Sequence, residues 1–414
     1  MLDIKFIRQN PEIVKKGCQR KQVKVNIDEI LKIDKTLREY QKEYESWRAA
    51  LNQLSKSKPD KEIIKKAKEL KFKIKSRETA INELEKKRKN LLLQIPNLPL
   101  DEVPIGKDER DNVVLKEVGE KPKFDFKPKD YLEIAQKLDL IDVKRAAKVS
   151  GTRFGYLKRE AVLIEFALIN FAFDTLTKEK FIPVIPPVML KSEMARGMGY
   201  LEQSDKEEAY YLPQDDLYLI GTSEQSIGVM HADEIFPEKE LPKRYLGFST
   251  CFRREAGSYG KDTRGIFRVH QFNKVEMFSF CYPEESKKEH RFFLEMEEKL
   301  MQALKIPYRV VQICTGDLGR PAAAKYDIEA WLPSQKRYRE THSTSNCTDF
   351  QARRLNIRYR DLKTRKLEFV HTLNGTAFAI GRMLIAIIEN YQQKDGSVRV
   401  PLVLQKYLNF KMVK

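Results

Sequence analysis

The stretch that decides the fold is residues 250–272, which read TCFRREAGSYGKDTRGIFRVHQF. The residues just before it are apolar and aromatic, as in a buried strand. The loop 256–265 holds three glycines and predicts a turn, and a second strand-like run begins at Ile266. The stretch therefore predicts a β-hairpin.

The hairpin would gather two arginines and two carboxylates, Arg253, Glu255, Arg268 and Glu276, provided that they share one face. Arginine binds phosphate and carboxylate groups, a carboxylate accepts hydrogen bonds from an amine, and an aromatic ring stacks on a base. On composition alone, these residues are compatible with such a ligand site and equally with an exposed hairpin of no function.

Five segments in order resemble a known family. Phe-Arg-Arg-Glu, the loop and Arg-Val-His-Gln-Phe together resemble motif 2 of the class II aminoacyl-tRNA synthetases. Four more segments narrow the resemblance to the seryl-tRNA synthetases: GTSE at 221–224, GSYGKDTRG at 257–265, SNCTDFQARR at 345–354 and NGTAFAIGR at 374–382. The likeness runs from Met1 to about Tyr407.

The resemblance implies the fold and the activity. The fold class is α+β, with a mixed, mostly antiparallel sheet flanked by helices and preceded by an N-terminal antiparallel α-helical coiled-coil arm. The implied enzyme is an AMP-forming serine–tRNA ligase. It uses ATP and Mg²⁺ to make seryl-adenylate and pyrophosphate, and then transfers serine to the 3′ end of tRNA-Ser. The resemblance leaves open whether tRNA-Sec is a second substrate. A homodimer in the cytoplasm is also implied.

The same resemblance assigns site residues. Arg253 and Arg382 would be catalytic, with Arg253 holding the ATP α-phosphate and the serine carboxylate. ATP would be bound by Arg253, Arg254, Glu255, Arg268, Val269, His270, Gln271, Phe272, Glu340, Thr341, His342, Ser343 and Arg382. Glu340 and Ser343 would hold Mg²⁺. Serine would be bound by Thr222, Glu224, Arg253, Glu276, Asn374 and Thr376.

The chain departs from the usual family pattern in two places. Thr341 and His342 stand where the family reads Ile-Ser or Val-Ser, and we favour a packing change for His342 over a contact within the site. Thr376 stands where many members have Ser, which keeps the hydroxyl and predicts a slightly tighter pocket.

An N-terminal arm is predicted between Ile27 and Ile95. Apolar residues recur every seven positions from Ile30 and again from Ile33, the pattern of a coiled-coil seam. A Pro-bearing turn at 55–60 interrupts the pattern, so the two helices must run antiparallel. Arg77 and Arg88 interrupt the second seam. We place the tRNA-binding domain at 1–109 and the catalytic domain at 110–414.

Charge is uneven along this arm. Residues 55–95 hold 14 Lys and Arg against 6 Asp and Glu, while residues 27–54 hold 5 against 6. Aromatic residues are scarce on the exposed positions, so we expect phosphate contacts and no base stacking. Lys65, Lys68 and Arg77 are the candidate tRNA contacts, with a merely solvated helix face as the alternative.

Composition sets further bounds. The net charge of +18 in 414 residues indicates a polyanionic partner, unless it serves only solubility. The five cysteines are widely spaced, which predicts a reducing compartment and no structural zinc. No signal peptide or membrane span is predicted, so we expect a soluble, cytoplasmic protein.

The very apolar helix at 158–178, with Pro186 after it, predicts either a dimer interface or ordinary core packing.

Two other functions compete with the synthetase. A related ligase that loads a carrier protein would lack the coiled-coil arm. A non-catalytic RNA-binding paralogue would be expected to lose Arg253, Glu276 or Arg382, and all three are present.

Overall fold

The computed structural model describes residues 1–56, 58, 60–201, 208–256, 260, 262 and 264–414. These divide into two compact units, Met1–Leu98 and Pro99–Lys414. The boundary predicted near Glu109 therefore lies too far along the chain. Residues after Leu98 already pack on the second unit: the Leu100 N–H donates to the Ala323 carbonyl (2.9 Å), and Val103 is buried with Val311.

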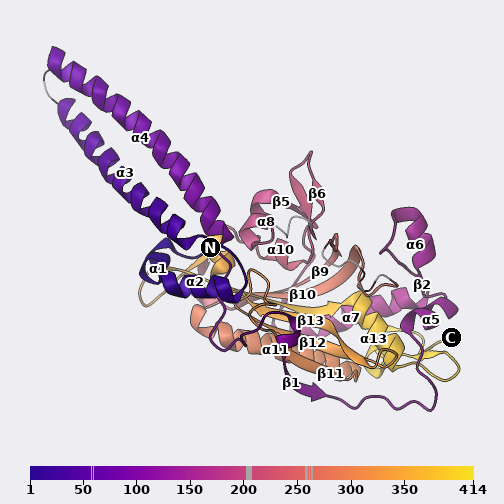
Figure 1. The fold of residues 1–414 in the computed structure, drawn as a ribbon. Coiled ribbons are helices and arrows are strands. Elements are labelled where there is room, and N and C mark those ends of the chain that lie inside the picture. Colours follow the sequence, from indigo (N-terminus) through magenta and orange to yellow (C-terminus); the bar gives the residue numbers. More distant parts are fainter. Residues whose placement is uncertain (57, 59, 202–207, 257–259, 261, 263) are drawn as a thin grey trace. The chain divides into compact units, whose positions relative to one another are not determined.

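The first unit is helical. It contains α1 (Ile4–Gln9), α2 (Pro11–Arg20), α3 (Ile27–Leu54) and α4 (Lys61–Gln94). The side chain of Asp60 accepts hydrogen bonds from the Glu62 and Ile63 N–H groups and caps the start of α4. Helices α3 and α4 lie side by side and antiparallel, which confirms the predicted hairpin (Figure 1).

The seam between α3 and α4 is apolar, with Ile33, Leu37 and Ile81 buried. The two arginines that interrupt the seam are paired across it. Arg88 Nη1 lies 2.8 Å from Asp34 Oδ1, and Arg77 Nη2 lies 2.6 Å from Glu43 Oε2. Each guanidinium therefore has a partner on the facing helix, so the coiled coil accommodates them.

The second unit is built on an eight-stranded sheet in the order β1-β11-β12-β13-β16-β10-β9-β4. Only the β4–β9 pair is parallel among these neighbours. The strands are β1 (Val113–Val118), β4 (Ile182–Val184), β9 (Lys243–Phe252), β10 (Gln271–Cys281), β11 (Tyr308–Gln312), β12 (Ala324–Leu332), β13 (Arg337–Asn346) and β16 (His371–Ala379). The mixed, mostly antiparallel sheet predicted from the sequence is confirmed.

Helices pack against this sheet through the largest core cluster, which α7, α11 and α13 share with β10, β12 and β16. Among the described residues, the α-helices of this unit are α5 (Tyr131–Lys137), α6 (Val143–Ser150), α7 (Glu160–Leu176), α8 (Ser192–Met198), α10 (Glu224–Ile227), α11 (Ser286–Leu304), α12 (Phe350–Leu355) and α13 (Ile380–Asn390). In the described part of the chain, no helix combines the length and apolarity needed to cross a bilayer.

Short strands form smaller sheets around the main one. They are β2 (Ile141–Asp142) with β3 (Tyr156–Leu157), β5 (Met189–Lys191) with β7 (Leu217–Leu219) and β6 (Tyr211–Leu212), β8 (Ile235–Pro237) with β14 (Arg358–Arg360) and β15 (Leu367–Phe369), and β17 (Val398–Arg399) with β18 (Met412–Val413). The predicted hairpin is β9 and β10, although β10 begins at Gln271 and not at Ile266. Ile266 and Phe267 are instead buried in the main core outside the strand.

Candidate active site

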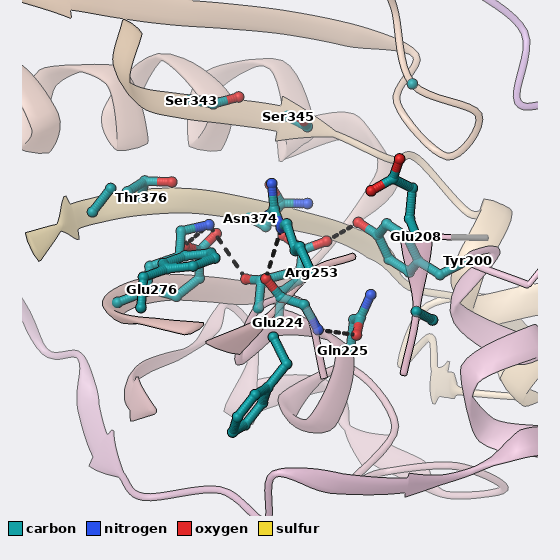
Figure 2. A pocket seen from close by; sticks show the side chains of 18 of the residues that line it. Tyr200, Glu208, Glu224, Gln225, Arg253, Glu276, Ser343, Ser345, Asn374 and Thr376 are labelled. Carbon is teal, nitrogen blue, oxygen red and sulfur yellow. Dashed lines mark hydrogen bonds and ion pairs between the residues drawn. The ribbon is translucent and has the colours of Figure 1, made fainter. Parts of the chain in front are cut away.

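A cavity of about 610 Å³ opens on one face of the main sheet. It is lined from β10, β13 and β16, from the end of β9 and from the segment 219–225. Figure 2 shows Glu224, Arg253 and Glu276 converging on one space in this cavity. The opposite face of the sheet is apolar and packs against helices in the main core. Because side chains alternate between the two faces of a strand, the polar residues of these strands lie on the cavity side.

Alternate residues of β10 and β16 form the floor of the cavity. Phe272, Lys274 and Glu276 are two residues apart on β10, and all three line the cavity. On the neighbouring strand, Thr376 pairs directly with Glu276. Asn374 is two residues before Thr376 and also lines the cavity. The predicted serine residues Glu276, Asn374 and Thr376 therefore share one patch.

A β-bulge places Glu340 and Ser343 on the same face of β13. Glu340 pairs with Glu329 and His342 pairs with Ile328, so Thr341 is the extra residue in the ladder. Without it, residues three apart would point to opposite faces. With it, Glu340, Thr341 and Ser343 all line the cavity.

His342 points the other way. It is buried at 1% exposure, and its ring packs 5.8 Å from that of Phe378. Burial lowers the pKa of His342 to about 3, so the ring is neutral at physiological pH. The prediction that His342 belongs to the ATP site is wrong in placement, and the packing role favoured above fits its position.

Arg253 is fixed by its backbone and side chain together. Its N–H donates to the His270 carbonyl (2.9 Å), and its Nε donates to the Gly221 carbonyl (3.1 Å). The guanidinium carbon lies 5.4 Å from the centre of the Phe272 ring. Arg253 lines the cavity, where a guanidinium suits an anionic ligand.

Arg382 forms a second cationic wall. Its Nη1 lies 3.3 Å from Glu340 Oε2 and donates to the Glu340 carbonyl (3.1 Å). Its guanidinium carbon lies 4.9 Å from the centre of the Phe267 ring. Enclosure acts to raise the pKa of the Glu340 carboxyl, but Arg382, Lys325 and Arg253 outweigh it and hold the pKa at about 2. Glu340 is therefore ionised, with a side chain 46% exposed toward the cavity.

Lys274 neutralises Glu276. Its ammonium lies 2.6 Å from Glu276 Oε2 and donates to Thr222 Oγ1 (3.3 Å). Glu276 is only 1% exposed. Burial raises the pKa of Glu276 to about 7, although the Lys274 charge acts in the opposite direction. An ammonium ligand would favour the ionised form of this carboxyl.

Glu224 has a different environment. It is 4% exposed and accepts a hydrogen bond from the Tyr200 hydroxyl, and both residues line the cavity. Burial and then the Glu224 charge raise the pKa of Tyr200 well above its usual value, so the hydroxyl keeps its proton. Among the described residues, no lysine or arginine forms an ion pair with Glu224. A buried carboxylate without a cation suits a cationic ligand group.

The remaining predicted residues are divided. Glu255, Arg268 and Val269 line the cavity, with an ion pair between Arg268 and Glu255. Arg254, His270 and Gln271 form no part of the cavity that the described residues enclose. The Arg254 guanidinium lies 5.7 Å from the Tyr210 ring, and His270 Nδ1 lies 2.9 Å from the Arg253 carbonyl oxygen. Arg254 alternates with Arg253 and Glu255, and Gln271 alternates with Phe272, so both point away from the cavity.

Lys274 and Tyr200 are among the cavity residues that the sequence analysis did not predict. Lys274 lies two residues before Glu276 on one strand, so strand alternation could have placed it beside that carboxylate. Tyr200 lies 24 positions before Glu224, after the end of α8, and no local sequence pattern indicates that the two meet.

The arm residues separate in the same way. Lys65 and Lys68 are exposed on α4. Arg77 is held inside the hairpin: its guanidinium carbon lies 3.8 Å from the centre of the Tyr40 ring, and its side chain is 22% exposed and paired with Glu43. The structure therefore does not present Arg77 as a contact for a partner.

Family models match both units. The tRNA synthetase class II core domain (G, H, P, S and T) matches residues 210–391, and the seryl-tRNA synthetase N-terminal domain matches residues 1–99. The chain is 47% identical over 423 residues to the serine–tRNA ligase of Dictyoglomus turgidum, covering 100% of this chain and 99% of that one. It is 46% identical to the serine–tRNA ligase of Pyrococcus horikoshii, covering 100% and 97%.

Solved structures agree with the sequence relatives. The seryl-tRNA synthetase from Pyrococcus horikoshii complexed with ATP superposes with a TM-score of 0.94 at 44% identity, covering 100% of this chain and 99% of that one. The cytoplasmic serine–tRNA ligase from Naegleria fowleri in complex with AMP gives a TM-score of 0.90 at 36% identity, with the same coverage.

Proposed function

This chain belongs to the seryl-tRNA synthetase family, and we propose that it activates L-serine with ATP and transfers the serine to the 3′ end of tRNA-Ser. The proposal rests on one observation: the residues expected to bind ATP and those expected to bind serine line the same cavity. Arg253 and Arg382 supply cationic walls, and Thr222, Glu224, Glu276, Asn374 and Thr376 supply a small polar pocket beside them.

In the first half-reaction, a serine carboxylate oxygen attacks the α-phosphorus of ATP. The new O–P bond forms while the bond to the oxygen that bridges to the β-phosphate breaks, and pyrophosphate leaves. Arg253, which the Gly221 carbonyl holds at 3.1 Å, would bind both reacting anions. One rigid guanidinium would then align the two groups and stabilise the charge that develops.

The ATP base would be held between two faces. Phe272 would stack on adenine from one side, and Arg382 would cover the other side and contact the γ-phosphate. The ion pair of Arg268 with Glu255 borders the same wall of the cavity. The ATP site so proposed keeps Arg253, Glu255, Arg268, Val269, Phe272, Glu340, Thr341, Ser343 and Arg382.

Serine recognition needs a partner for each polar group. Glu224 would accept the ammonium, because it is the carboxylate without a cation among the described residues. Glu276, with Lys274 and Thr222, would bind the hydroxyl together with Thr376. An amino acid without a hydroxyl would leave these buried groups unpaired, which is penalised by up to about 10⁴-fold in sites of this kind.

Magnesium is the proposed cofactor of ATP. Glu340 is ionised, and with the Ser343 hydroxyl it supplies the hard oxygen ligands that Mg²⁺ prefers. No cluster of three or more His, Cys, Asp or Glu side chains in the described residues is arranged to hold a metal alone. An ion at Glu340 and Ser343 would therefore take further ligands from the phosphates, and it would neutralise their charge.

The active form is proposed to be a homodimer. Helix α7 buries Ala167 and Leu168 against the core but leaves Leu163 and Phe166 46% and 57% exposed. Ile185, after β4, is 81% exposed. Several exposed apolar side chains of this size are typical of a subunit interface.

Transfer to tRNA completes the proposal. The terminal adenosine hydroxyl attacks the acyl carbon of seryl-adenylate, and AMP leaves. A cytoplasmic location is also proposed, because five buried cysteines scattered along the chain suit a reducing compartment. Charging of tRNA-Sec as well as tRNA-Ser is a further proposal, because phosphate contacts by the arm depend on the charge and shape of the RNA.

Aminoacylation tests the proposed function directly. Purified tRNA-Ser, ATP, Mg²⁺ and labelled serine should give acid-precipitable seryl-tRNA, while threonine and alanine should give almost none. If serine is not charged on tRNA-Ser at any concentration, the proposed function fails.

A further inference from the structure

The outer face of α4 is a continuous basic stripe. Positions 61, 65, 68, 72, 75, 79, 82, 86 and 89 are three or four residues apart and all are exposed, so they follow one side of the helix away from the seam. They hold six lysines (Lys61, Lys65, Lys68, Lys75, Lys86 and Lys89) and no carboxylate. At the rise of an α-helix, the stripe is about 40 Å long.

These lysines differ from the cations near the seam. Arg77, Lys87 and Arg88 are each paired with a carboxylate of α3, at 2.6–2.8 Å. Within the described part of the chain, none of the six stripe lysines forms an ion pair. Their charge is therefore available to an external polyanion.

One stripe residue is aromatic. Phe72 is 76% exposed, with Lys68 one turn before it and Lys75 one turn after it on the same face. Single exposed apolar residues are common, so exposure alone decides nothing. A protein partner would need a contiguous apolar patch, and the neighbours of Phe72 along the stripe are lysines. A ring between cations matches a ligand with phosphates and bases.

We propose that Phe72 is a stacking platform for an unpaired base of the tRNA, set within a row of phosphate-binding lysines. The proposal rests on the proposed function, since it names a contact for the RNA substrate. It also revises the expectation that the arm makes no base contact. The lysines would position the RNA backbone, and Phe72 would require one base to leave its stack.

The binding experiment compares Phe72→Ala with Ile64→Ala, a matched loss of an apolar side chain that is 47% exposed on the same helix. The dissociation constant for purified tRNA-Ser is measured at several salt concentrations. Phe72→Ala should weaken binding about 5- to 100-fold, with an unchanged slope of affinity against salt, because no charge is removed. Ile64→Ala should bind as the parent does. Lys68→Gln should weaken binding and flatten the slope.

A fluorescence experiment tests stacking itself. In Phe72→Trp, the added indole should be quenched by saturating tRNA-Ser, after subtraction of the parent protein with Trp47 and Trp331. Absence of added quenching, or Phe72→Ala binding within twofold of Ile64→Ala, would overturn the stacking proposal. A mass that falls from a higher oligomer in Phe72→Ala would also overturn it, in favour of a contact between protein copies.

The two proposals fail in different ways. If the parent protein neither binds nor charges tRNA-Ser, the proposed function is wrong. If the parent charges tRNA-Ser and Phe72→Ala binds it normally, only the stacking platform is wrong.

Discussion

The Lys274 ammonium lies 2.6 Å from the Glu276 carboxylate at the floor of the cavity, and both side chains are almost fully buried. Breaking such a pair leaves one charge buried without a partner, which costs more than an exposed pair would. The pair is therefore suited to hold a hydroxyl acceptor in one orientation.

From this pair we predict a selective loss of serine use. Glu276→Gln and Thr376→Val should raise the KM for serine or lower kcat/KM for serine at least tenfold, while the KM for ATP stays within a few-fold. The reason is that each change removes a partner for the buried serine groups and leaves the cationic walls intact. Steady-state kinetics with each substrate varied measures both. Unchanged serine constants in both variants would reject the pocket assignment.

Acid should destabilise the fold through buried histidines. Burial lowers the pKa of His342 to about 3 and those of His290 and His371 to about 4, against about 6.5 in an unfolded chain. Unfolding below pH 6.5 therefore takes up protons, and stability is lost as the pH falls from there toward 4.

His342→Gln removes one of these groups. Between pH 7 and pH 5, its free energy of unfolding should fall by about 2 kcal/mol less than that of the parent, from the difference in the two pKa values. Urea unfolding at both pH values measures this. An equal fall in parent and variant would mean that His342 takes up protons in the folded protein.

We predict a dimer that depends on the exposed apolar residues of α7. Light scattering at micromolar concentration should give twice the mass of one chain. Phe166→Glu should shift the mass toward one chain, because a charge in an apolar interface loses its hydration. A monomeric parent with full charging activity would contradict the dimer.

A shortened arm should separate the two half-reactions. Removing residues 42–78 and joining the ends with a short Gly/Ser linker deletes the stripe from Lys61 to Lys75 but keeps the base of the hairpin, where Asp34 pairs with Arg88. The apolar core around Ile30, Leu92 and Ile95 also stays.

Seryl-adenylate formation should persist in this variant, since the catalytic residues lie in the other compact unit. Charging of tRNA-Ser should fall steeply at physiological salt. Charging at the parental rate would show that the arm does not grip the RNA.

Periodic patterns made much of the fold predictable. The seven-residue repeat from Ile30 predicted the helical hairpin, and the two apolar runs on either side of the loop 256–265 predicted the β9–β10 pair. Local patterns could not reveal the bulge at Thr341, because it depends on how β13 pairs with β12. Because of that bulge, Glu340 lies on the same face of β13 as Ser343, and both line the cavity.

The arm shows what a charge count misses. Arg77, Lys65 and Lys68 are all basic residues of one helix, and only the heptad pattern, in which Arg77 interrupts the seam, separates Arg77 from the two lysines. Their roles differ because Arg77 occupies a seam position, where Tyr40 and Glu43 hold it, while the lysines face solvent. Similarly, Phe72 stands out only once the helix face to which it belongs is known.

Arg253 is proposed to join the serine and ATP sites, and ATP–pyrophosphate exchange measures this role directly. The parent protein with Mg²⁺ should exchange label only when serine is present, with little response to threonine or alanine. Arg253→Ala should lose about 10²–10³ of this rate. Arg145→Ala, which removes a cation from the exposed end of α6, should not change it. Exchange at the parental rate in Arg253→Ala would show that Arg253 does not join the two sites, and exchange without serine would show that serine is not the substrate.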